Sequence, residues 1–316
     1  AAITFDENKV DTDYIFHFLE TQYENLRQVS AGNSGRGGLN LKMISGYKVP
    51  IPYPDNPKKS LEIQKEIVRI LDTFTELTTE LTTELSARKK QYNYYRDKLL
   101  SFEGGEVEYL PMGHEDVGEF IRGGGLQKKD FTETGVGCIH YGQIYTHYGT
   151  FADKTKTFVS EEFFKKARKA KTGDLIIATT SENDEDVCKS VAWLGKDEIA
   201  VSSDACIYRH KLNPKFVSYF FQTEQFQKQK RQYITGAKVR RVNADKLAKM
   251  LIPVPSKNEQ ERIVNILDKF DTITSSISEG LPREIKLRQQ QYEYYRDLLL
   301  SFPQANSDLN EVKVDA

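Results

Sequence analysis

The chain contains one sequence unit twice, with the two copies about 200 residues apart. Residues 91–102 (QYNYYRDKLLSF) recur as residues 291–302 (QYEYYRDLLLSF), with ten of twelve residues identical. Three further segments recur: residues 13–22 match 215–224, residues 51–54 (IPYP) match 252–255 (IPVP), and residues 64–74 (QKEIVRILDTF) match 260–270 (QERIVNILDKF). Repetition on this scale indicates duplicated domains related by pseudo-symmetry, so that whatever one copy binds, two copies bind at a fixed separation.

The first copy is shorter than the second, because the repeat length places the start of a complete first unit roughly 100 residues before Ala1. Residues 1–50 match only the last quarter of a unit, a helix and a basic approach to the Pro motif. We therefore expect an apolar helix face to lack part of its cover and to seek a partner surface. That face consists of Phe5, Tyr14, Ile15, Phe18 and Leu19. It can pack on its own rod, pair with a second copy or receive a separate fragment, and we expect association.

Two long helices are predicted, over residues 61–102 and 259–302. In the first, apolar residues recur with the heptad spacing of a coiled-coil seam. They are Ile63, Ile67, Ile70, Phe74, Leu77 and Leu81, followed by Leu85. The second helix carries Phe270 on its apolar stripe and is expected to kink or break at Gly280, Leu281 and Pro282. Each stripe needs cover, so we expect the two rods to pair as an antiparallel coiled coil.

Three Thr-Glu-Leu-Thr-like tetrads, between residues 75 and 86, place Leu77, Leu81 and Leu85 four residues apart. Two interpretations remain open. The tetrads are either simple low complexity in a helix or a cassette that sets the length of the rod, adding about 6 Å and about 40° of rotation each.

A globular α+β domain with mostly antiparallel pairing is predicted between the rods. Strand-like runs separated by Gly and Asp occur as GCIHYGQIY, KTFVS, DLIIATTS, SVAWLG and EIAVSSDACIY, and helical patterns cover residues 161–171 and 215–233. The predicted organisation is a domain remnant (1–54), a long helix (55–103), the complete domain (104–255), a second long helix (256–303) and a polar tail (304–316).

Composition indicates a globular chain without a membrane span. Charged residues make up 29%, Tyr and Phe number 17 each, and no run of 18 apolar residues occurs. Three scattered cysteines favour reduced, buried thiols in a cytoplasmic protein. The net charge is -1, yet residues 226–249 hold eight Lys and Arg against Asp245 alone. The charge is therefore segregated, and a nucleic-acid partner stays open.

Several kinds of chemistry lack their sequence signatures. Gly123, Gly124 and Gly125 are followed by no Lys-Ser or Lys-Thr pair, so a turn is favoured over a phosphate loop. The five His and three Cys show no metal-ligand spacing. An amino-methyltransferase signature and the converging carboxylates of a nuclease are also missing. We expect no catalytic residue and no metal site in this chain.

The candidate DNA-binding residues lie in four segments. Residues 233–243 combine a Gly turn with Lys238, Arg240, Arg241 and Asn243: cations contact phosphate, whereas Arg reads guanine and Asn reads adenine. A solvated basic helix face is the competing interpretation. The other candidates are Lys128 and Lys129 after the glycines, Tyr141, Gln143 and Tyr145 on one face of an expected strand, and Thr180 and Ser181 before an acidic loop. For the expected strand, cross-strand aromatic packing fits as well as base contact.

The IPxP, EQxxIVxILDxF and QYxYYRDxLLSF elements, together with the tetrads, resemble the specificity subunits of type I restriction-modification systems over nearly the whole chain. The resemblance implies that each globular domain recognises one half of a split site in double-stranded DNA. It also implies that the helices set the spacing and dock two methyltransferase subunits, with restriction subunits added. This chain then binds no cofactor, and S-adenosylmethionine, ATP and Mg²⁺ are expected on the partner subunits. The shortened first copy suggests a homodimer or a complementing fragment.

Two other classes of function compete with this interpretation. One is a coiled-coil scaffold whose basic surface binds an acidic protein, and the other is a nuclease with an unfamiliar active site. A steep salt dependence separates DNA binding from the scaffold, and divalent-dependent cleavage identifies the nuclease.

Overall fold

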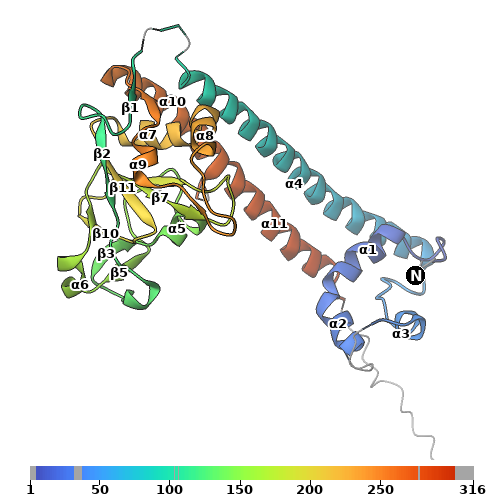
Figure 1. Ribbon diagram of the computed structural model, residues 1–316. Helices are drawn as coiled ribbons and strands as arrows, with labels where there is room; N and C mark the ends of the chain where they lie inside the picture. Colours follow the sequence, from blue (N-terminus) through green and yellow to red (C-terminus); the bar gives the residue numbers. More distant parts are fainter. Residues whose placement is uncertain (1–4, 32–37, 103, 106, 277, 303–316) are drawn as a thin grey trace, which may run out of the picture. The chain divides into compact units, whose positions relative to one another are not determined.

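The computed structural model describes residues 5–31, 38–102, 104–105, 107–276 and 278–302 (Figure 1). The predicted polar tail lies outside the described residues. The chain divides into two compact units: unit 1 comprises Ala1–Leu85 and Ile277–Ala316, and unit 2 comprises Ser86–Ser276. Among the described helices, none combines the length and the apolar character needed to cross a bilayer.

Unit 1 is helical. Its helices are α1 (Thr12–Thr21), α2 (Tyr23–Ala31), α3 (Leu41–Ser45), the first part of α4 (Pro57–Leu99) and α11 (Gly280–Leu299). Helix α4 is one unbroken helix, as predicted, but it begins four residues earlier than expected. The reason is local: Pro57 suits a first helical position because it has no N–H to leave unpaired, and the Asn56 side chain accepts from the N–H of Lys59 at 3.1 Å.

Unit 2 contains the strands, seven helical segments of its own and the end of α4. Its strands are β1 (Tyr109–Pro111), β2 (Gly118–Arg122), β3 (Val136–Ile139), β4 (Phe151–Ala152), β5 (Thr157–Val159), β6 (Lys169–Ala170), β7 (Leu175–Ala178), β8 (Thr180–Ser181), β9 (Ser190–Trp193), β10 (Ile199–Val201), β11 (Ala205–His210), β12 (Arg240–Arg241) and β13 (Leu251–Pro253). Its helical segments are η1 (Lys128–Asp130), α5 (Tyr141–Thr146), α6 (Glu161–Lys166), α7 (Pro214–Phe221), α8 (Glu224–Arg231), α9 (Ala244–Leu247) and α10 (Lys257–Ser275).

A five-stranded sheet, in the order β2-β11-β7-β9-β4, separates two apolar cores of unit 2. In β7, Leu175 and Ile177 face the core that α7 and α10 share, whereas Ile176 and Ala178 face the second core, so that the strand is buried on both sides. A second sheet of unit 2 has four strands, in the order β5-β3-β10-β6. Among the pairings of the described strands, only β10 with β3 and β4 with β9 are parallel. The expectation of a mostly antiparallel α+β domain is confirmed.

The sequence repeat is also a repeat of contacts. In unit 1, buried Gln64 accepts from the N–H of Asp11, which caps α1, at 2.8 Å. In unit 2, buried Gln260 accepts from the N–H of Asn213, which caps α7, at 2.7 Å. The equivalent glutamine side chain thus holds the start of the equivalent helix in each unit.

The two long rods each contribute residues to both units. Helix α4 begins in unit 1 and ends in unit 2, whereas the second rod begins as α10 in unit 2 and ends as α11 in unit 1. In unit 1, Phe74 of α4 stacks on Tyr295 of α11, with ring centroids 5.4 Å apart. In unit 2, Phe270 of α10 stacks on Tyr95 of α4 at 5.7 Å. Within unit 1 the pairing is antiparallel, because Phe74 of α4 meets Tyr295, whereas the earlier Leu71 lies in one cluster with the later Leu300. The second rod is interrupted between Ser275 and Gly280, so the predicted break is confirmed a few residues earlier than expected.

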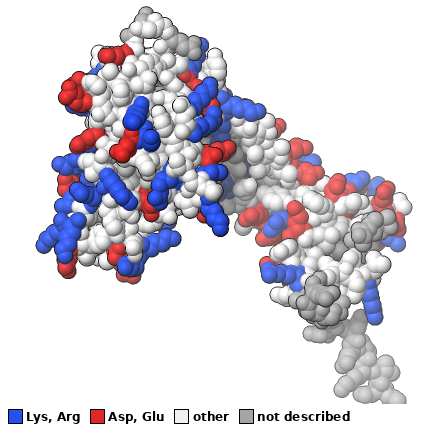
Figure 2. Space-filling view, in the orientation of Figure 1, with Lys and Arg blue, Asp and Glu red and all other residues white. Residues whose placement is uncertain are grey.

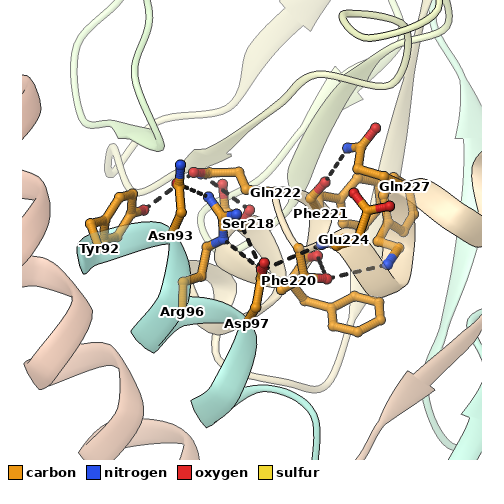
Figure 3. A network of polar contacts seen from close by, with 12 residues as sticks. Tyr92, Asn93, Arg96, Asp97, Ser218, Phe220, Phe221, Gln222, Glu224 and Gln227 are labelled. Atoms are coloured by element: carbon orange, nitrogen blue, oxygen red, sulfur yellow. Dashed lines mark hydrogen bonds and ion pairs between the residues drawn. The ribbon is translucent and has the colours of Figure 1, made fainter. Parts of the chain in front are cut away.

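The end of α4 contacts the junction of α7 and α8 through polar groups (Figure 3). The hydroxyl of Tyr92 donates to Gln222 at 3.2 Å. The carboxylate of Asp97, itself held by Arg96, accepts from the N–H of Glu224 at 3.3 Å. An anion at the start of α8 is favourable because the first N–H groups of a helix lack internal partners.

The expectation that the apolar face of α1 lacks cover is wrong for most of its residues. Tyr14, Ile15 and Phe18 are buried against Ile67, Val68, Leu71 and Leu300, and Phe5 and Leu19 pack at the edge of the same cluster. The helix packs on its own rods, since the α4 stripe needs the same cover. Phe16, which points away from this cluster, is 59% exposed.

Three local expectations are also corrected. The helical pattern predicted over residues 215–233 is two helices, α7 and α8, because Thr223 caps a new start by accepting from the N–H of Phe226. The pattern predicted over residues 161–171 ends at Lys166. The segment at Gly123 is extended rather than a turn: a Cβ there would lie 2.0 Å from the carbonyl oxygen of Ser202, so glycine permits a close backbone approach.

Candidate nucleic-acid interface

Four predicted DNA-binding residues lie together on the paired strands β8 and β12. Arg240 is opposite Ser181 and Arg241 is opposite Thr180. On the other edge of β12, Arg241 and Thr235 exchange two backbone hydrogen bonds of 2.9 Å. The result is a narrow two-stranded ribbon, in which Thr180 is buried, Ser181 is half-buried and Arg241 is exposed.

The loop that returns into β12 presents Lys238. Gly236 has φ +91° and begins the turn. A side chain there would clash with the carbonyl of Val239, so glycine is required. Lys238 is exposed and Val239 is 53% exposed. Of the three cations, Lys238 is therefore the one presented at the tip of a hairpin.

Arg240 and Arg241 are not the unpaired charges that the sequence suggests. The Nε of Arg240 lies 2.7 Å from the Oδ1 of Asp184, and an Nη of Arg241 lies 3.6 Å from the Oδ1 of Asp204. Arg240 also donates from Nη1 to the carbonyl of Gly236 at 2.6 Å. The acidic loop after β8 therefore supplies the carboxylate that pairs with Arg240 of the ribbon.

Lys230, which the sequence counts in the basic segment, is fully buried. Its ammonium donates to the carbonyls of Glu185 and Val187 at 2.9 and 3.0 Å. Burial lowers the pKa of Lys230. It holds the acidic loop in place and is not a surface contact for DNA.

The segment predicted as a strand with alternating Tyr141, Gln143 and Tyr145 is wrong beyond Ile139, because it continues as helix α5. A capping box decides this: the imidazole of His140 accepts from the N–H of Gly142, and Gln143 accepts from the N–H of His140. Gln143 also donates to Thr157, so its amide is held within the domain.

Two of these aromatic residues still border the ribbon. The hydroxyl of Tyr145 donates to the carbonyl of Thr180 at 2.6 Å, and burial raises the pKa of Tyr145. The N–H of Tyr141 donates to Ser202, beside the loop that carries Asp204. Tyr145 thus holds β8 in position, and Tyr141 lies next to the loop that carries Asp204.

The lysines after the glycines, Lys128 and Lys129, are exposed on the short helix η1. Burial, followed by the charge of Lys128, lowers the pKa of His140, whereas Asp204 opposes the shift. The charges of Lys128 and Asp204 therefore both influence the pKa of His140. This imidazole connects η1 with the loop at the side of the ribbon.

A hollow of about 450 Å³ lies beside β12. Its lining includes Arg122, Asp204, Arg241 and Asn243. Asn243 begins α9, but its side chain makes no capping hydrogen bond and is exposed, so its amide is available to another group. Sequence reasoning considered the acidic loop that carries Asp184 but did not select Arg122 or Asp204, which lie beside the candidate residues. The only local signal for Asp204 was its place between two strands.

On the face of unit 2 that Figure 2 shows, Lys and Arg are not separated from Asp and Glu. Within the described residues, no group of His, Cys, Asp and Glu fits a metal ion. Cys138, Cys188 and Cys206 are free and buried, and burial raises the pKa of each thiol.

A family model described as the type I restriction modification DNA specificity domain matches residues 2–89 and 107–287. The chain belongs to this family. It is 40% identical to the type I restriction enzyme EcoR124I/EcoR124II specificity subunit of Escherichia coli, over 96% of this chain and 74% of that protein. A putative type I specificity subunit of Haemophilus influenzae is 32% identical over 94% of this chain and 74% of its own length.

Solved structures of this family share the fold. A chain from a structure of the assembly and conformational transition of the type I R-M system has a TM-score of 0.63 at 13% identity, covering 94% of this chain and 73% of that chain. The HsdS subunit of Thermoanaerobacter tengcongensis has a TM-score of 0.51 at 14% identity, covering 94% and 71%. The family match favours sequence-specific DNA recognition over the scaffold and nuclease alternatives.

Proposed function

We propose that this chain is the DNA-reading subunit of a type I restriction-modification complex and that unit 2 recognises one half of a bipartite site. The observation that carries the proposal is membership of the specificity-subunit family over almost the whole chain. The segment around β12 supports it, because Lys238, Arg241 and Asn243 are all exposed there, which offers cations for phosphate and an available amide for a base.

The chemistry is proposed to belong to partner subunits. Methyltransferase subunits bind S-adenosylmethionine and methylate adenine, and restriction subunits bind ATP and Mg²⁺. This chain contributes no catalytic residue and directs both activities to the site. The relatives' description as specificity subunits supports this division of labour.

The repeated helix ends are the proposed docking points for two methyltransferase subunits. Tyr94 is 60% exposed in unit 2 and Tyr294 is 64% exposed in unit 1. Each ring stands edge-on to its neighbour, Tyr95 or Tyr295, with centroids 5.3 Å apart. Exposed tyrosines are common at interface centres, and the same arrangement in both units suits two copies of one partner.

A reconstitution experiment tests the proposal. The chain, the methyltransferase subunits and their mixture are each incubated with double-stranded DNA and labelled S-adenosylmethionine. Methyl transfer is expected only from the mixture and only at one motif. Methylation by the chain alone, divalent-dependent cleavage by the chain alone, or equal methylation without the chain would each contradict the assignment.

A further inference from the structure

The two arginines of the ribbon each form an ion pair with a carboxylate from a different loop, at 2.7 Å for Arg240 and 3.6 Å for Arg241. Asp184 comes from the loop between β8 and β9, and Asp204 comes from the loop between β10 and β11. Together with Lys238, the ribbon holds three cations and two anions, a net charge of +1. A surface built only to attract phosphate would not place two carboxylates against two of its three cations.

Both loops are anchored to the domain. The carbonyl of Asp204 accepts from the N–H and the hydroxyl of Thr179, at 2.9 and 3.0 Å. In the other loop, Asn183 donates to and accepts from Asp186 at 2.8 Å, and buried Lys230 binds two carbonyls. Burying an ammonium is costly, so these contacts indicate that the position of the loop matters. The backbone segments that carry the two carboxylates are therefore held next to the ribbon.

A guanidinium group held in this way keeps donors for a second partner. It has five N–H donors in a rigid fork. Arg240 donates one Nη1–H to the carbonyl of Gly236, and its Nε lies in an ion pair with Asp184, so both N–H groups of Nη2 remain for another partner. Two parallel donors at that end match the O6 and N7 acceptors of guanine. The fixed fork favours a directed base contact over a diffuse phosphate contact.

We propose that Asp184 and Asp204 are positioning residues for target specificity. They fix the guanidinium groups of Arg240 and Arg241 for base recognition and neutralise them against phosphate, while Lys238 supplies phosphate affinity. The inference rests on the proposed function and assigns different tasks to cations that are adjacent in the sequence.

The test compares Asp184→Asn and Asp204→Asn with Glu182→Gln, a matched control that removes one exposed carboxylate from the loop of Asp184. The full chain is assembled with its methyltransferase subunits, and its motif is identified by sequencing methylated DNA. Binding to duplexes with and without that motif is then measured across a salt series.

Each Asp→Asn variant is expected to lower the ratio of target to non-target affinity about tenfold, the effect of one lost bidentate base contact. On non-target DNA, the slope of log affinity against log salt becomes steeper by about 0.9, because one freed arginine now contacts a phosphate. Glu182→Gln retains the ratio of the unmodified complex. Arg240→Lys, which keeps the charge but loses the fork, should lower the ratio without steepening the slope.

The outcomes separate the inference from the proposed function. If the unmodified complex shows no preference for any duplex, the proposed function fails. If it shows a preference that Asp184→Asn and Asp204→Asn leave intact, or if Glu182→Gln changes ratio and slope equally, the positioning role is wrong and the carboxylates act through charge alone or not at all.

Discussion

Buried polar side chains fix the local geometry of both units. Gln64 and Gln260 each hold the start of a helix, and Lys230 holds the acidic loop beside the ribbon. His210 differs from these three, because neither of its buried ring nitrogens has a well-formed hydrogen bond, although the backbone of Leu212 favours its charged form. An unsatisfied buried imidazole is tolerated only in its neutral form.

The stability of unit 2 is expected to fall in mild acid because of His210. Burial lowers its pKa from 6.5 to about 4, although Asp174 opposes the shift. Between these two values the unfolded chain binds more protons than the folded chain, so the stability present above pH 6.5 is lost as the pH falls towards 4. The loss is up to about 3 kcal/mol, since one pKa unit corresponds to about 1.4 kcal/mol.

His210→Phe removes the titrating group but keeps a ring next to Tyr208. Urea unfolding at pH 7 and pH 4.5 should therefore show a smaller acid loss for this variant than for the unmodified chain. Exposed His147 provides the control: His147→Gln is expected to leave the acid loss unchanged. An equal acid loss in all three proteins would show that other groups dominate.

Lys238 is expected to account for most of the salt dependence that the ribbon contributes. Lys238→Ala should weaken DNA binding on all sequences and lower the salt slope by about 0.9, the effect of one neutralised phosphate. Lys165→Ala, an exposed lysine on α6, is the control. A slope that stays the same after Lys238→Ala, measured by fluorescence anisotropy, would exclude a phosphate contact.

At the scale of elements, the periodic sequences were predictable and the short ones were not. The rods and their break could be predicted because an apolar stripe over many turns specifies a helix whatever surrounds it. Helix α5 could not be predicted in this way, because the alternation of Tyr141, Gln143 and Tyr145 fits a strand until the His140 cap is considered. The ion pairs of Arg240 and Arg241 were hidden because their partners come from other loops, and sequence spacing carries no signal for such contacts.

The tetrads of α4 satisfy their polar side chains within the helix, which fits both low complexity and a length-setting spacer. Leu77, Leu81 and Leu85 are half-buried, and the hydroxyls of Thr78 and Thr82 donate to carbonyls one turn earlier, at 2.8 and 2.7 Å. The threonines thus satisfy their own hydroxyls within the helix. A change in the length of this segment distinguishes the two interpretations.

Deleting residues 79–82 should shorten the rod by about 6 Å and rotate one end by about 40°. The methylated motif is then expected to keep both half-sites but to lose about two base pairs of spacer, although DNA bending absorbs part of the change. A deletion of the same length in the tail, residues 304–307, serves as the control. Methylation at the original spacing would show that the tetrads do not set the distance.

At the scale of the whole molecule, the duplication predicts duplicated docking. Tyr94→Ala and Tyr294→Ala should each weaken the binding of one methyltransferase subunit, and the double variant should weaken both. Light scattering of the assembled complex gives the stoichiometry, which is expected to fall from two subunits to one in either single variant. Because both rings are exposed, the variants should unfold at the same temperature as the unmodified chain. Two bound subunits in the double variant would remove these tyrosines from the interface.

The central claim is that unit 2 reads DNA bases, and sequencing of methylated adenines in a host that expresses the chain with its methyltransferase subunits tests it most directly. The unmodified chain is compared with the double variant Arg241→Ala and Asn243→Ala. The account predicts a bipartite motif for the unmodified chain. In the variant, one or two base pairs in the half that unit 2 reads should no longer be required, while the rest of the motif and its spacer stay the same. An identical motif in the variant, or the same motif in a host without the chain, would contradict the account.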